Sequence, residues 1–154
     1  MYFSQEVALS DDMGSVLLVR ENGVYRCTSA KCTHLGAPLK KGVLHNGRVR
    51  CPWHGACFST DSGDIEEMPG IDNLQTYSVM TEGSDLVIFA SDSELKEWKR
   101  PSTLCSRNAR DGRTFAVVGA GAAGYECVET LRKEGFEVRF FFALASSFFA
   151  IGHF

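Results

Sequence analysis

Two short segments of the 154-residue chain each combine one cysteine with one histidine at close spacing. The first contains Cys32 and His34, and the second contains Cys51 and His54. Together they offer two thiolates and two imidazoles as ligands. An asymmetric [2Fe–2S] cluster needs this set, with the cysteine pair on one iron and the histidine pair on the other. We therefore predict that these four residues are metal ligands.

A structural zinc site uses the same residue types and is the main alternative. Common zinc spacings place two cysteines close together in the sequence and two histidines close together. Mixed cysteine–histidine pairs depart from that pattern, so the spacing favours the iron–sulfur cluster. Both segments also contain residues that restrict the backbone to tight turns and limit ligand mobility, namely Gly36, Pro38, Pro52 and Gly55.

Predicted β-hairpins position these segments. Asn22-Gly23 and Asn46-Gly47 each lie between short apolar or β-branched runs, and both dipeptides tolerate the positive φ that two-residue hairpin turns need. Residues 82–85 join a third pair of strand candidates. A first strand before Val16 is expected to be weak or missing. Several short strands at this spacing predict a small antiparallel sandwich or barrel over Val16–Ala90.

The pattern Cys32-x-His34, a spacer, and Cys51-Pro-x-His54-Gly resembles the motif of the Rieske [2Fe–2S] family. The resemblance covers roughly residues 14–90. It implies a mainly β chain with a Rieske-type antiparallel β-sandwich. It also implies that the cluster lies at the tip of two loops with its histidine ligands near solvent.

Neighbours of the ligands differ from those of high-potential Rieske proteins. Those relatives carry two cysteines that form a disulfide, at positions that match Ala37 and Trp53 here. They also carry a serine and a tyrosine whose hydroxyls bind the cluster sulfurs, where this chain has Ala56 and Phe58. Fewer donors to sulfur disfavour the added electron, which implies a potential in the lower part of the roughly −150 to +300 mV Rieske range. Trp53 is expected either to shield the cluster edge from water or simply to pack.

The pattern changes in the last forty or so residues. Phe115–Val118 predicts a strand, and a glycine fingerprint follows it at the start of the predicted helix Ala122–Lys133. The fingerprint consists of Gly119, Gly121 and Gly124. Such glycines allow a tight turn and close approach to a dinucleotide pyrophosphate at the helix N-terminus. With a second strand at Val138–Phe142, this order predicts the start of a Rossmann-like βαβ unit.

The order of a Rieske domain, a charged linker and this fingerprint resembles the apoptosis-inducing factor 3-like flavoproteins. The resemblance implies NAD(P)H oxidation through FAD, with the Rieske cluster as a one-electron partner. No acidic residue follows Val138, although an acid about 20 residues after the glycines is expected to bind a ribose hydroxyl. The sequence also departs from the family at about Phe140. We therefore expect a truncated fragment of the FAD/NAD-binding domain with an aberrant tail, which does not retain FAD.

The predicted organisation is a Rieske domain over residues 1–92, a charged linker over 93–113 and the βαβ fragment over 114–154. A net charge of −3 offers no basic footprint for nucleic acid, and no apolar run is long enough to span a bilayer. The first residues lack an export or transit pattern, which favours the cytoplasm, whereas the family resemblance allows mitochondria. The other four cysteines are expected to be buried hydrophobes or idle thiols: Cys27, Cys57, Cys105 and Cys127. His45 and His153 are expected to be a solvated hairpin residue and a tail residue.

No arrangement of catalytic residues is apparent, so the chain by itself is predicted to be an electron carrier rather than a complete enzyme. The expected partner is a flavin reductase domain or an electron acceptor protein. Two alternatives stay open at this point. One is a non-redox interaction or regulatory module in which the cluster is a structural staple. The other is the ferredoxin component of an oxygenase system, which does not account for the glycine fingerprint.

Overall fold

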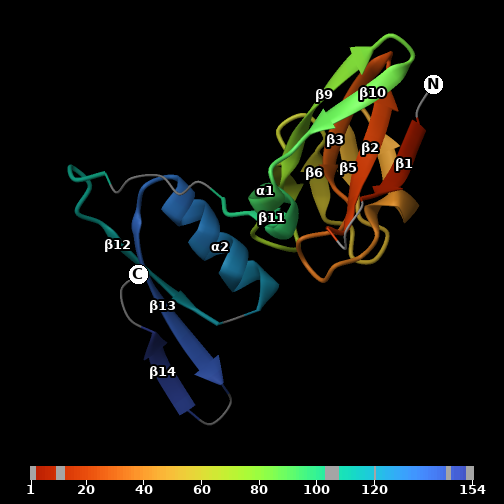
Figure 1. The fold of residues 1–154 in the computed structure, drawn as a ribbon. Helices are drawn as coiled ribbons and strands as arrows, with labels where there is room; N and C mark the ends of the chain where they lie inside the picture. The colour runs from red at the N-terminus through yellow and green to blue at the C-terminus, as the bar shows by residue number, and fades with distance from the viewer. Residues whose placement is uncertain (1–2, 10–12, 103–107, 120, 145–146, 152–154) are drawn as a thin grey trace. The chain divides into compact units, whose positions relative to one another are not determined.

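The computed structural model describes residues 3–9, 13–102, 108–119, 121–144 and 147–151. The chain divides into two compact units, residues 1–102 and 103–154 (Figure 1). The division lies inside the segment that the sequence analysis assigned to a linker. Each unit is described by itself below.

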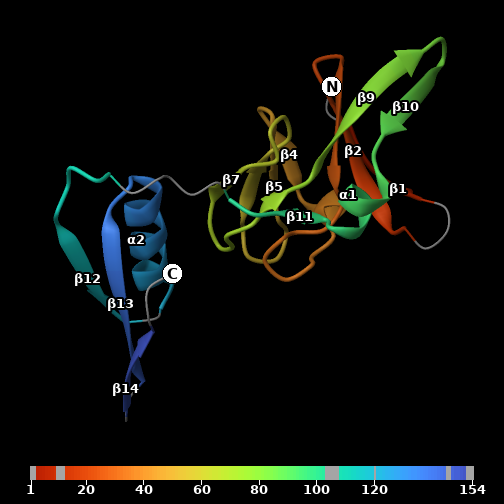
Figure 2. The ribbon, with the colours of Figure 1, turned by 60° about the vertical axis from the view of Figure 1, so that its left-hand side comes forward.

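The first unit is built from two antiparallel sheets, which Figure 2 shows as separate layers. One has the order β1-β2-β3-β9-β10 and the other the order β4-β5-β6-β7, and a short pair, β8 and β11, lies beside them. This arrangement confirms the predicted mainly β, antiparallel fold. The strands of the large sheet are β1 (Phe3–Ala8), β2 (Ser15–Glu21), β3 (Val24–Ser29), β9 (Thr76–Glu82) and β10 (Asp85–Phe89). The other strands are β4 (Val43–His45), β5 (Arg48–Arg50), β6 (Cys57–Ser59), β7 (Ile65–Glu67), β8 (Asn73–Leu74) and β11 (Lys99–Arg100).

The apolar run in β2 is buried on both faces of its sheet. Successive side chains of a strand point to opposite faces. Leu17 and Val19 accordingly belong to the core shared with Phe58 of the small sheet, whereas Val16 and Leu18 pack on the other face. A continuous apolar stretch, rather than strict alternation, is what burial on both faces requires.

Both predicted asparagine–glycine turns are confirmed. Asn22 and Gly23 have φ of 52° and 85°, and Asn46 and Gly47 have φ of 48° and 72°. The second turn is also fixed from outside the hairpin. The backbone N–H of Gly47 donates to the Glu21 carboxylate at 2.5 Å, and the Gly47 carbonyl accepts from the Thr60 N–H at 2.7 Å. The turn of the β4–β5 hairpin is therefore held by Glu21 of the large sheet and by Thr60, which follows β6.

The expectation of a weak or missing first strand was wrong. β1 pairs with β2 over six residues, from Phe3 opposite Arg20 to Ala8 opposite Ser15. The pairing is supported by tertiary contacts that a local pattern does not contain, because Glu6 accepts a hydrogen bond from Ser15 and forms an ion pair with Lys40 at 2.6 Å. Lys40 lies in the 3₁₀ helix η1 (Leu39–Lys41), far along the chain.

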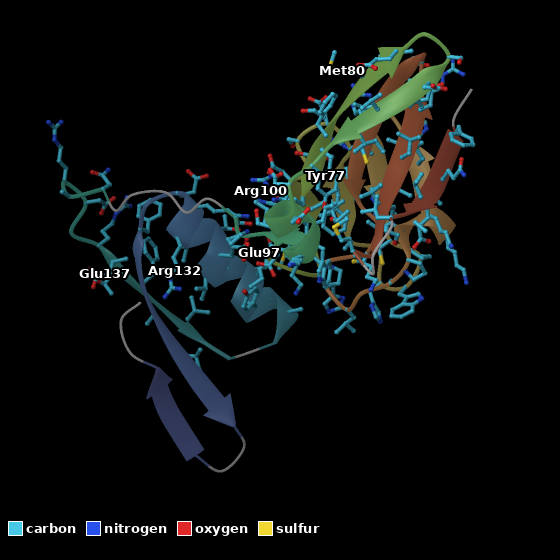
Figure 3. The ribbon with its side chains drawn as sticks, viewed as in Figure 1. Tyr77, Met80, Glu97, Arg100, Arg132 and Glu137 are labelled. Carbon is cyan, nitrogen blue, oxygen red and sulfur yellow. The ribbon has the colours of Figure 1, made fainter. Side chains whose placement is uncertain are left out.

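Part of the predicted linker packs into the first unit. Helix α1 (Asp92–Lys96) begins with a capping box between Ser91 and Glu94, and its Leu95 packs against the second face of the large sheet. The Tyr77 hydroxyl donates to the Glu94 carbonyl at 3.4 Å, and Arg100 in β11 donates to the Ser62 carbonyl at 2.8 Å (Figure 3). These contacts extend the first unit to residue 102.

The second unit contains a strand, a helix and two further strands. β12 (Thr114–Val118) is parallel to β13 (Glu137–Leu144), and α2 (Ala122–Lys133) connects them. The predicted βαβ order is therefore confirmed, and Gly135 follows the helix with a φ of 83°. β14 (Ser147–Ile151) pairs antiparallel with β13.

Within the described residues, none of the helices combines the length and apolar character needed to cross a bilayer.

Candidate metal centre

The two cysteine–histidine segments form loops with the same backbone closure. In the first loop, the Cys32 N–H donates to the Ala37 carbonyl and the Gly36 N–H donates to the Cys32 carbonyl, both at 2.8 Å. In the second, the Cys51 N–H donates to the Ala56 carbonyl at 2.8 Å and the Gly55 N–H to the Cys51 carbonyl at 3.2 Å. Each loop thus turns back on its cysteine, although their histidine spacings differ.

A glycine in the left-handed region makes each closure possible. Gly36 and Gly55 have φ of 75° and 81°, a conformation that side-chain-bearing residues rarely adopt. The first loop follows β3 and the second connects β5 to β6. As predicted from sequence, each potential ligand pair therefore lies on a tight loop after a strand.

The two predicted cysteine ligands lie next to each other inside the core. Cys32 and Cys51 are only 1% and 4% exposed and belong to the apolar cluster between the sheets. Burial, together with the neighbouring Cys51 thiol, raises the pKa of the Cys32 thiol to about 11. Because metals bind thiolates, iron must displace protons from this buried pair when it binds.

The two predicted histidine ligands lie next to each other closer to the surface. Their ring centroids are 5.0 Å apart and the rings meet edge to face at 74°. His34 is half-buried, and its buried Nδ1 atom has no hydrogen-bond partner. Buried polar atoms are nearly always hydrogen-bonded. The unpartnered Nδ1 of His34 is therefore the nitrogen that fits a bond to iron. His54 is exposed.

The four residues form two pairs rather than one tetrahedral group. Within the part of the chain that the structure describes, no three His, Cys, Asp or Glu side chains converge as ligands of a single ion. A two-iron cluster takes two protein ligands on each iron, so a cysteine pair and a separate histidine pair fit it.

A third loop, over residues 68–72, covers His34 and was missed in the sequence analysis. A Cβ built on Gly70 would lie 3.5 Å from His34 Cβ, which is ordinary van der Waals contact. The Thr33 hydroxyl donates to the Asp72 carbonyl at 2.7 Å and ties this loop to the first one. Asp72 in turn forms an ion pair with Lys99 of β11 at 3.5 Å. The Pro69-Gly70 dipeptide signals a turn, but only the fold places that turn over a histidine.

The residues that replace the hydroxyl and disulfide positions of high-potential relatives are apolar or exposed. Ala37, Ala56 and Phe58 are buried in the core around the cysteine pair. Trp53 is 57% exposed and meets His54 edge to face with 6.4 Å between the ring centroids. It therefore lies beside the exposed histidine rather than in the core.

The remaining cysteines fall into two groups. Cys27 and Cys57 are buried, as expected, and burial raises the pKa of the Cys27 thiol to about 12. Cys127 is exposed on α2. His45 is exposed at the end of β4. Cys105 and His153 lie outside the described residues.

Comparison with known families identifies the domain. Residues 4–78 match the model of the Rieske [2Fe–2S] domain, a range that includes both loops and the third loop. The chain belongs to the Rieske [2Fe–2S] family. Rieske domains bind a [2Fe–2S] cluster and transfer electrons, so the iron–sulfur interpretation holds over structural zinc.

Named relatives fall into two kinds. The chain is 47% identical over 131 residues to apoptosis-inducing factor 3 of Mus musculus, across 82% of this chain but 22% of that protein. It is 35% identical over 83 residues to the 3-phenylpropionate/cinnamic acid dioxygenase ferredoxin subunit of Shigella boydii, across 53% of this chain and 78% of that protein. The Sphingomonas yanoikuyae B1 ferredoxin has a similar structure, with a TM-score of 0.52 and 26% identity, across 57% of this chain and 87% of that one. The chain thus spans about a fifth of its apoptosis-inducing factor 3 relatives.

The glycine fingerprint lies in the structural context that the sequence analysis required. Gly119 follows β12 with a φ of 111°, and Gly121 precedes the first residue of α2. A Cβ on Gly124 would come within 2.3 Å of the Gly119 carbonyl oxygen, so the third glycine permits close packing of helix on turn. A role of these glycines in FAD binding by the full-length family, and the loss of FAD from this fragment, both stay predictions.

The loop geometry generates a prediction about cluster content. Gly36→Ala and Gly55→Ala should each cost about 1–2 kcal/mol through left-handed backbone strain alone, and should lower the iron content of purified protein. Gly83→Ala is the matched control, because Gly83 has a φ of 61° with open space around it but lies in the β9–β10 turn. It should lower the unfolding midpoint to a similar extent and leave the iron-to-protein ratio unchanged. An equal loss of iron in all three variants would contradict the expectation.

Proposed function

We propose that this chain holds a low-potential [2Fe–2S] cluster on Cys32, His34, Cys51 and His54, and exchanges single electrons with a partner protein at the histidine edge. The observation that carries the proposal is the pairing of two histidine rings 5.0 Å apart, one with an orphaned buried Nδ1, beyond a pair of buried cysteines. When bound, the cluster supplies reversible one-electron oxidation and reduction.

The buried and the exposed residues of the site have different proposed roles. The core around Cys32 and Cys51 excludes water from the sulfur end of the site. The exposed ring of His54 and its neighbour Trp53 provide the surface at which a partner can approach. Electron transfer between proteins needs the two redox centres to come close together, and an exposed edge of the site allows this. The half-buried His34 and the exposed His54 therefore form the proposed exit for the electron.

A low reduction potential is supported by the apolar side chains at two positions near the cysteine pair. Ala56 and Phe58 stand where the Rieske resemblance places donors to sulfur, and both are fully buried. Two buried hydroxyls of this unit are used elsewhere, because Thr33 donates to the Asp72 carbonyl and Thr60 to the Gly47 carbonyl. Without hydroxyls at these two positions to stabilise added negative charge on sulfur, the oxidised state is favoured.

We further propose that the electron comes from a flavin reductase that oxidises NAD(P)H. The similarity to apoptosis-inducing factor 3 spans 82% of this chain. The resemblance to the apoptosis-inducing factor 3-like flavoproteins implies a Rieske domain that works with FAD- and NAD-binding domains. The glycine fingerprint between β12 and α2 is consistent with that arrangement. FAD itself is proposed to bind to a reductase rather than to the βαβ unit of this chain, which lacks an acid after Val138.

A second candidate is the ferredoxin component of an oxygenase system. It is favoured by the 35% identity to a dioxygenase ferredoxin subunit of which this chain covers 78%. The two candidates differ in the electron acceptor rather than in the chemistry of the cluster.

The ligand assignment predicts a specific pattern of variants. Cys32→Ala, Cys51→Ala, His34→Ala and His54→Ala should each abolish visible absorption and the EPR signal of the dithionite-reduced protein, because each removes an iron ligand. The controls are Cys57→Ala and His45→Ala, which change the same residue types outside the four ligands and should retain two iron atoms and two sulfides per chain. A variant such as His54→Ala that keeps a reducible cluster would remove that residue from the ligand set. A purified protein containing zinc and no reducible chromophore would refute the electron-transfer proposal.

The low potential is tested by adding a donor. Ala56→Ser should raise the midpoint potential by about 20 to 60 mV, the equivalent of one ordinary hydrogen bond in a one-electron couple. Ala30→Ser, at a buried alanine outside the two loops, is the control and should leave the potential unchanged. Protein-film voltammetry measures both. A wild-type potential in the upper half of the Rieske range would contradict the proposal directly.

The electron source is tested with the whole 154-residue chain. Titration with FAD should show no bound flavin after gel filtration, whereas an added FAD-containing NADH reductase should bleach the visible absorption when NADH is supplied. Retention of one FAD per chain would overturn the proposal that flavin binds elsewhere. Failure of every flavin reductase tried, together with rapid oxidation of the reduced protein by a Rieske-type terminal oxygenase, would favour the second candidate.

A further inference from the structure

Arg50 joins the second cluster loop to a strand that is not its neighbour. It is the last residue of β5 and directly precedes Cys51. Its Nη1 donates to the Gly55 carbonyl at 2.8 Å, and its Nη2 donates to the Glu67 carboxylate of β7 at 2.7 Å. One guanidinium therefore bridges the loop residue that follows His54 and the outer strand of the small sheet.

The bridge passes over a small side chain. Arg50 lies opposite Cys57 in the β5–β6 register, and Cys57 lies opposite Glu67 in the β6–β7 register. Residues directly opposite each other share a face of the sheet. Both charged side chains influence the Cys57 thiol, whose pKa is raised mainly by burial. A side chain as small as cysteine in this row lets the guanidinium reach across β6 to the carboxylate.

The second loop is more exposed than the first. The first loop is covered by residues 68–72, with Gly70 against His34 and Thr33 bonded to Asp72. In the second loop, by contrast, three consecutive residues, 52–54, are exposed. Gly55 has a φ of 81°, a conformation that glycine adopts without strain, so the direction of its carbonyl is left to the contacts that the carbonyl makes.

We propose that Arg50 is a positioning residue for His54, acting through the Gly55 carbonyl and itself oriented by Glu67. The inference rests on the proposed role of His54 as an iron ligand. Arginine suits the task because its planar fork directs two donors at two acceptors at once, whereas the single ammonium of lysine cannot hold both in this geometry. Contacts that orient metal ligands commonly have a large effect on how tightly the metal is retained.

The chain supplies a matched control on the same strand. Arg48, two residues earlier on β5, forms an ion pair with Glu66 of β7 and is exposed to a similar degree. It has the same charge, the same kind of partner and the same sheet, but it does not contact the cluster loop through any hydrogen bond recorded for the described residues.

The experiment compares Arg50→Lys with Arg48→Lys in the full chain carrying its cluster. Arg50→Lys should lose its visible absorption about fivefold faster in the presence of an iron chelator, because the loop opens more often when one contact of a charged donor is lost. Its reduced EPR signal should broaden, since His54 samples a wider range of orientations. Glu67→Gln, which keeps an acceptor but removes its charge, should accelerate the loss about twofold. Arg48→Lys should match wild type in both measurements.

Two results would overturn the positioning role: Arg50→Lys losing its cluster at the wild-type rate with an unchanged signal, or Arg48→Lys accelerating the loss to the same extent as Arg50→Lys. If circular dichroism shows that Arg50→Lys does not fold, the rate of cluster loss is compared between Glu67→Gln and Glu66→Gln instead. Equal rates in these two variants refute the role.

Failure of the ligand assignment itself is distinguished by His54→Ala. If His54→Ala retains its cluster, the proposed function is refuted. If His54→Ala loses its cluster but Arg50→Lys behaves like wild type, only the positioning role is refuted.

Discussion

The site depends on one constraint: two thiols from different hairpins must meet inside the core while two imidazoles from the same loops remain near the surface. Cys32 and Cys51 satisfy the first part because the apolar cluster between the two sheets includes them. The matching backbone closures of the two loops satisfy the second, since each turns back on its cysteine through a left-handed glycine. The packing of the two sheets therefore also brings the proposed cysteine ligands together.

This arrangement assigns different physical environments to the two ends of the proposed cluster. Around the cysteine pair, burial is nearly complete and the adjoining side chains, Ala37, Ala56 and Phe58, are apolar. Around the histidine pair, the environment is mixed, with His34 half-buried under the third loop and His54 exposed beside Trp53. An interior sulfur end and an accessible imidazole end suit a centre that must exclude water yet exchange electrons with another protein.

Charged residues near the site act mainly by fixing loops. Glu21 holds the β4–β5 turn, Asp72 joins the third loop to β11, and Arg50 joins the second loop to β7. Exposed ion pairs contribute little to stability by themselves. The value of the Asp72–Lys99 and Arg50–Glu67 pairs lies in geometry, because each connects segments whose positions affect the loops. Glu21 is buried and acts through a hydrogen bond to the Gly47 backbone instead.

Much of the first unit follows from local rules. The asparagine–glycine turns and the cysteine–histidine spacing are read within short windows, because turn conformation and ligand chemistry depend on neighbouring residues. The same is true of the strand, glycine fingerprint and helix of the second unit, where a missing Cβ at Gly124 has a local steric reason. Composition and motif thus determined the cofactor class and the mainly β fold before any contact was known.

Other features were decided only by tertiary structure. β1 was expected to be weak or missing because its stability comes from pairing with β2 and from the contact of Glu6 with Lys40, which is distant in sequence. The loop over His34 and the Arg50 bridge were missed for the same reason: a Pro-Gly turn or an exposed arginine has no distinctive local pattern until the fold brings it to a ligand. The sequence by itself determined which chemistry this chain can hold, since ligand type is a property of individual side chains. Which residues lie in position to hold the proposed ligands was decided by the tertiary structure, because positioning depends on contacts between segments far apart along the chain.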